Sequence, residues 1–137
     1  MEPTVKLALL CDYAFRTQDN KLSVIGIFSQ ISVAEMPGAS PPFFVVISLG
    51  LDRGTHGVQF GIVDPMGQQV LPDAPSFDVE VETPGADTDL LLQFNGLPLN
   101  RPGIYQVQLF IEGRLTHSIP VSVQGISAQG MGPIRAN

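Results

Sequence analysis

From residue 77 to residue 82 apolar and acidic side chains alternate strictly, and this pattern constrains the fold more than any other feature. Phe77, Val79 and Val81 hold the odd positions, and an Asp or Glu follows each of them. Successive side chains of a β-strand point to opposite faces, so the segment predicts a strand with one buried and one acidic face. Other period-two stretches recur along the chain, and no long pattern has the 3.6-residue period of a helix. The sequence therefore predicts an all-β fold.

Turn-forming residues divide these stretches into about eight short strands. Asp64-Pro65-Met66-Gly67 has the Asp, Pro and Gly positions of a type I turn. Three of the seven residues from Met36 to Pro42 are proline, which prevents a regular hydrogen-bond ladder and indicates a crossover between sheets. Strand number and spacing predict an antiparallel β-sandwich of immunoglobulin-like or Greek-key type. The expected strands are 4–15, 22–33, 43–51, 57–63, 77–82, 90–94, 104–111 and 115–123.

The length of 137 residues is typical of one domain with a single core. We assign residues 1–123 to this domain. Residues 124–137 contain Gly, Pro and few large apolar side chains, and they are predicted to form a flexible C-terminal tail.

The single cysteine excludes an internal disulfide and suits a reducing cytoplasm. No apolar segment approaches the roughly 20 residues that span a bilayer. Residues 5–11 superficially resemble a lipoprotein cleavage site, but Lys6 interrupts the run and bulky Leu10 precedes Cys11. We therefore expect a cytoplasmic protein in which this run is a strand and Cys11 is a small core residue.

The negative charge of the chain is concentrated in one segment. The net charge is −6, and no Lys or Arg occurs between Arg53 and Arg101. That segment carries the acidic residues Asp64, Asp73, Asp78, Glu80, Glu82, Asp87 and Asp89. An acidic surface repels phosphates, so neither nucleic acid nor an anionic membrane is expected as a partner.

Tyr105 lies at the start of a predicted strand, after Arg101-Pro102-Gly103-Ile104, and in phase with Val107 and Leu109. This arrangement is typical of the tyrosine corner of Greek-key sandwiches, in which a phenol hydrogen-bonds to the backbone a few residues upstream. A buried phenol requires such a partner. We therefore predict a structural role for Tyr105.

Four short motifs, spread over residues 5–123, resemble those of a family of small uncharacterised bacterial proteins classed as a domain of unknown function. The motifs are Cys11-Asp12-Tyr13-Ala14, Lys21-Leu22-Ser23-Val24-Ile25-Gly26-Ile27-Phe28, Asp64-Pro65-Met66-Gly67 and Pro102-Gly103-Ile104-Tyr105. The resemblance implies a cytoplasmic bacterial protein with a β-sandwich fold. It implies no activity and assigns no site residue.

The sequence offers little support for catalysis. It has no nucleophile elbow, phosphate loop or dinucleotide fingerprint, and His56 and His117 lie in no Cys/His cluster. We expect neither an enzyme nor a cofactor. Asp87-Thr88-Asp89 is the best metal candidate, because two carboxylates at a loop edge could reach a calcium ion. A calcium- or small-ligand-binding sandwich is therefore the alternative function, ahead of an unrecognised hydrolase.

Three runs are apolar at consecutive positions, although a two-layer sandwich buries only alternate residues. The runs are Val24–Phe28, Phe43–Ile47 and Leu90–Leu92. Loops, the tail, a second protomer or a different partner could cover the second face. We predict that Phe44 and Val46 form the interface of a symmetric homo-oligomer, away from the acidic segment. Tyr13 and Phe15 form either a surface anchor or an end cap. The predicted function is a non-catalytic, self-associating protein-interaction module.

Overall fold

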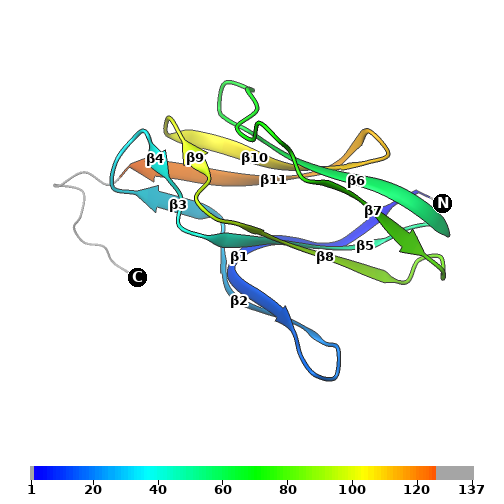
Figure 1. Cartoon of the computed structure of the whole chain (residues 1–137). Coiled ribbons are helices and arrows are strands. Elements are labelled where there is room, and N and C mark those ends of the chain that lie inside the picture. The colour runs from blue at the N-terminus through cyan, green and yellow to red at the C-terminus, as the bar shows by residue number, and fades with distance from the viewer. Residues whose placement is uncertain (1, 126–137) are drawn as a thin grey trace.

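The computed structural model describes residues 2–125, and every regular element in this range is a strand. A four-stranded sheet has the order β2-β1-β5-β8, and a five-stranded sheet has the order β3-β11-β10-β6-β7. Figure 1 shows these sheets as two stacked layers. The strands are β1 Thr4–Arg16, β2 Leu22–Phe28, β3 Gln30–Val33, β4 Gly38–Ala39, β5 Phe43–Gly50, β6 Gly54–Val63, β7 Ser76–Val81, β8 Asp87–Phe94, β9 Pro98–Leu99, β10 Gly103–Ile111 and β11 Arg114–Gly125.

The predicted all-β sandwich is confirmed, but two strand predictions need correction. The segment 22–33 is two strands that separate at Ser29, with β2 in the four-stranded sheet and β3 in the other. The β3 strand pairs in parallel with β11, whereas the other strand pairs of the described residues are antiparallel. Gly125 pairs with Val33, so β11 includes the first residues of the predicted tail. The rest of that tail lies outside the described residues.

Alternating residues of the facing strands form the core between the two sheets. Val45, Ile47 and Leu49 of β5 are almost completely buried, and Phe60 of β6 is fully buried among them. Burying a side chain of this size stabilises the fold by about 1.5–3 kcal/mol. No helix of residues 2–125 is long and apolar enough to cross a membrane.

Tyr105 lies fully buried in this core, and its phenol reaches back four residues along the chain. The Tyr105 hydroxyl donates to the Arg101 carbonyl at 2.8 Å, and the Arg101 N–H approaches the same oxygen at 3.4 Å. This geometry is that of a tyrosine corner. It fixes the chain where it enters β10.

Replacing Tyr105 with Phe is expected to lower the free energy of unfolding by about 1–2 kcal/mol. The ring stays packed, but the Arg101 carbonyl loses the hydroxyl that donates to it. Denaturant titration measures the effect as a lower midpoint with an unchanged slope. An unchanged midpoint would show that the hydrogen bond adds no stability.

The turn before β10 packs against the type I turn after β6. Asp64 is buried and its carboxylate accepts the Met66 and Gln68 amides at 2.8 and 2.9 Å, which fixes the type I turn. Gly103 has φ +136°, and a Cβ on it would lie 2.6 Å from Cγ of Pro65. Two motifs that are far apart in the sequence therefore meet at one contact, which only glycine fits.

Candidate interaction surface

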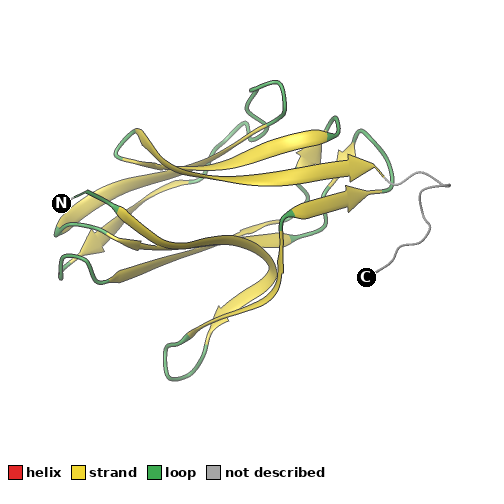
Figure 2. Cartoon of the chain, turned by 180° about the vertical axis from the view of Figure 1, so that it is seen from behind, coloured by secondary structure: helices red, strands yellow, loops and turns green. Residues whose placement is uncertain are grey.

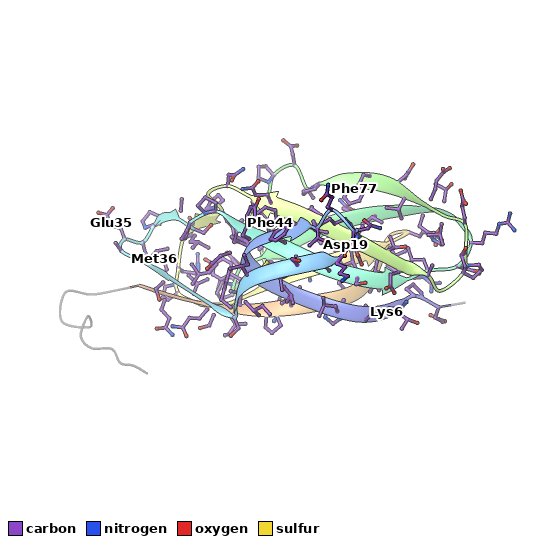
Figure 3. All side chains as sticks on the ribbon, turned by 90° about the horizontal axis from the view of Figure 1, so that it is seen from below. Lys6, Asp19, Glu35, Met36, Phe44 and Phe77 are labelled. Carbon is purple, nitrogen blue, oxygen red and sulfur yellow. The ribbon has the colours of Figure 1, made fainter. Side chains whose placement is uncertain are left out.

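The β1–β2 hairpin extends outside the two stacked sheets. The first half of β1 pairs with β5, from Thr4 to Cys11, and the second half pairs with β2, from Leu10 to Arg16. Figures 1 and 2 show the hairpin leaving the four-stranded sheet on the side away from the five-stranded sheet. Seen from that side in Figure 3, the hairpin lies across the sheet, with Asp19 at its tip and Phe44 beside it.

Gly26 lies where the hairpin bends. Its φ is +73°, in the left-handed region, and the register of β1 with β2 omits Gly26 and Asp12. A Cβ at position 26 would overlap the Asp12 carboxylate. Glycine adopts this conformation without steric cost, so it permits the bend. Two further motifs of the sequence therefore pack together here.

The folded hairpin covers the outer face of the four-stranded sheet. Val46 is fully buried there in a cluster with Cys11 and Ala14, and partly buried Leu22 and Val24 pack against this cluster. The prediction that a second chain covers Val46 is therefore wrong, because the chain covers this residue itself. The ring of Phe44 is half-buried and lies 5.5 Å from the ring of Tyr13, edge to face.

Two ion pairs connect β1 to β8. Arg16 of the hairpin pairs with Asp89, whose side chain is only 10% exposed. Lys6 pairs with Asp87 at 2.6 Å and also donates to the Gly85 carbonyl at 2.7 Å. The Arg16–Asp89 pair therefore connects the end of the hairpin near its tip to strand β8 of the four-stranded sheet.

These contacts correct the prediction of a metal site at Asp87 and Asp89. Both residues belong to strand β8, which begins at Asp87, and each carboxylate already binds a cation of the same chain. Within residues 2–125 no group of three or more His, Cys, Asp or Glu side chains gathers as metal ligands. Calcium requires six to eight oxygens, so the pair does not support a calcium site.

Cys11 lies at the base of the hairpin, fully buried in the cluster with Ala14 and Val46, and is not suited to nucleophilic chemistry. Burial is the main cause that raises the pKa of its thiol, and the neighbouring Asp12 carboxylate raises it further. The reactive form of a cysteine is the thiolate, which this environment disfavours. The thiol can therefore report when the hairpin lifts from the sheet.

Arg16→Gln is expected to speed modification of Cys11 by a soluble disulfide reagent by about tenfold, because it removes the partner of a carboxylate that is only 10% exposed and so makes local opening easier. Lys6→Gln is the matched control. Its partner Asp87 has a side chain that is 69% exposed, and exposed pairs contribute roughly 0–1 kcal/mol. Equal rates in the two variants would show that Arg16 does not hold the hairpin down.

The hairpin carries three large apolar side chains that remain in contact with solvent. The exposed fractions are 51% for Tyr13, 56% for Ile25 and 63% for Ile27. Tyr13 pairs with Ile25 across the two strands, and its ring lies 5.6 Å from that of Phe15. We call Tyr13, Ile25 and Ile27 the hairpin patch. The sequence indicated Tyr13, whereas the two isoleucines belonged to a run whose outward face was not identified.

The two histidines lie in separate strands, His56 near the start of β6 and His117 within β11. His56 Nε2 donates to the Asp52 carbonyl at 2.7 Å, and its Nδ1 lies 3.7 Å from the Glu112 carboxylate. These contacts join the turn before β6 to the β10–β11 turn. His117 is half-buried in β11 opposite Leu109. Neither ring lies beside a nucleophile among the contacts of the described residues.

Solved structures with a similar fold include parts of two larger proteins, of which this chain spans less than a third. A DNA-bound alkylpurine DNA glycosylase from Pseudomonas fluorescens superposes with a TM-score of 0.52 and 12% identity, over 89% of this chain and 30% of that chain. A β-glucosidase from Listeria innocua gives 0.50 and 11% identity, over 72% of this chain and 15% of that chain. An immunoglobulin-like protein from Pseudomonas aeruginosa gives 0.40 and 16% identity, over 90% and 97%. At these identities the likeness to the first two shows the fold alone.

The sequence comparisons point to one family. No curated protein matches the sequence. The model of a family described as "Family of unknown function (DUF6941)" matches residues 6–124, which include the hairpin, the bend and the tyrosine corner.

Proposed function

The chain belongs to the DUF6941 family, and we propose that it is a non-catalytic protein-interaction module of the cytoplasm that binds protein through the hairpin patch. One observation carries the proposal: three large apolar side chains, each more than half exposed, lie together on one hairpin. Soluble proteins rarely leave such side chains grouped unless they contact something else. The single buried cysteine supports a reducing compartment.

The contacts of the other candidate residues favour binding over catalysis. Tyr105, Asp64 and His56 bind backbone groups of their own chain, and Asp87 and Asp89 bind basic side chains. An active site requires a nucleophile or a base that is free to reach a substrate. The hairpin patch requires only a partner that removes its apolar surface from water.

The charge distribution supports a protein partner. The solvent face of β7 carries Asp78 and Glu80, which would repel phosphates of a nucleic acid or an anionic membrane. The patch contains no charged residue, and Tyr is among the residues enriched at protein interfaces. The partner's contact surface should therefore be apolar.

Photo-crosslinking in the cells that naturally make the protein tests the proposal. A benzophenone amino acid at position 27 should give a specific crosslinked product. The same group at position 104 is the matched control, because Ile104 is 51% exposed on β10 of the other sheet. Products of equal kind and amount at both positions, or none at position 27, would refute the hairpin patch as a binding surface.

A further inference from the structure

We infer that the partner of the hairpin patch is a second copy of this chain, which packs the same patch against the first about a two-fold axis. The inference rests on the proposed function and specifies its partner. It differs from an interface at Phe44 and Val46, because the hairpin itself covers Val46.

The first step concerns charge. Each copy carries a net charge of −6, so contact between two copies is favoured where the surface carries the fewest acidic residues. Among the four edge strands of the two larger sheets, β7 carries Asp78 and Glu80, and β8 carries Asp87 and Asp89. The uncharged edge β3 exposes only polar Gln30 and Ser32. The edge β2 has no charged residue of its own and is apolar at its exposed positions, and one carboxylate, that of Asp12 on β1, lies against its Gly26.

The second step concerns self-complementarity. A two-fold contact places the same patch on both sides, so its chemistry must suit itself. Tyr13, Ile25 and Ile27 meet this condition, since apolar side chains pack against one another without needing opposite charges. A basic partner would instead find its complement on the acidic strands β7 and β8.

The third step concerns area and sets the expected strength. Three large side chains, each more than half exposed, present on the order of 300 Å² of apolar surface. The contact uses the patch twice, and partly exposed Phe15 and Phe44, whose rings lie beside that of Tyr13, can extend it. The patch used twice gives about 600 Å², which is below the roughly 1,200 Å² at which stable specific interfaces begin and within the range of weak ones. The association should therefore be weak, with a Kd on the order of 10–100 µM.

Sedimentation equilibrium of the purified chain between about 1 and 300 µM tests the inference, because this range spans the expected Kd. The wild type should change from monomer to dimer. Ile27→Glu should raise the Kd at least about tenfold, since it places two like charges at the contact. Ile104→Glu, on the other sheet, should change it by less than about twofold. Raising the salt concentration should strengthen the dimer, because the −6 charges repel.

Three outcomes would overturn the inference: a wild type that stays monomeric throughout, a dimer that Ile104→Glu weakens as much as Ile27→Glu, and a dimer that both variants leave intact. The crosslinking experiment separates this inference from the proposed function. A product at twice the chain mass from position 27 supports both. A product with a different protein, together with a monomeric purified chain, would leave the interaction module standing and remove self-association.

Discussion

Val46→Glu is expected to destabilise the domain strongly, with a loss of about 4 kcal/mol or more in the free energy of unfolding. Val46 of β5 is fully buried beneath the folded hairpin, in a cluster of apolar side chains. A carboxylate there would lose its hydration without gaining a partner. Because domains are stable by only about 5–15 kcal/mol, a large fraction of the chain should be unfolded or have its hairpin detached.

Ile27→Glu is the matched control for this prediction. It introduces the same charge in the hairpin that covers Val46, but at a side chain that is 63% exposed, so the free energy of unfolding should change by no more than about 0.5 kcal/mol. Denaturant titration and the Cys11 modification rate measure the two effects together. If Val46→Glu were as stable as the wild type and kept Cys11 protected, the hairpin would not cover this face.

Gly103→Ala is expected to lower the free energy of unfolding by about 3 kcal/mol, from two separate causes. The φ of +136° is unfavourable for alanine, at about 1–3 kcal/mol. In addition, the new Cβ would lie 2.6 Å from Cγ of Pro65, and the proline ring belongs to a turn fixed by Asp64. Overpacking of this kind typically costs 1–3 kcal/mol.

Gly54→Ala separates the two causes. Gly54 has φ +129°, nearly the same as Gly103, but a Cβ there would meet no atom within 4 Å. It should therefore show the backbone cost alone, and thermal or denaturant unfolding should find it less destabilising than Gly103→Ala. Adding Pro65→Ala should recover part of the loss in Gly103→Ala, as a double-mutant cycle would show. Equal losses of unfolding free energy in Gly103→Ala and Gly54→Ala would mean that the structure accommodates a Cβ beside Pro65 without cost.

Features with a short sequence range were predictable from the sequence. Alternation identified most of the strands, because the two-residue period of side chains is a property of each strand by itself. Tyr105 reaches only four residues back, to Arg101, so its pattern appears within one motif. The local pattern gave a wrong prediction for residues 22–33. These residues look like one continuous strand, yet the chain passes from one sheet to the other at Ser29.

The candidate surface was less predictable, because its contacts join distant residues. Arg16 meets Asp89 across 73 positions and Lys6 meets Asp87 across 81, so carboxylates that suggested a metal site are in fact paired. The exposure of Ile25 and Ile27 depends on the direction in which the hairpin bends. Gly26 permits that bend, but a glycine within an apolar run does not by itself specify it.

The sequence alone determined that this chain forms a β-sandwich and that its doubled apolar runs need cover on a second face. Only the tertiary structure decided that the hairpin covers Val46 and leaves Tyr13, Ile25 and Ile27 exposed. The physical reason is that the hydrophobic effect is non-directional. It requires that apolar surface leave water, but the choice between a chain's own hairpin and another molecule depends on backbone geometry and on long-range contacts.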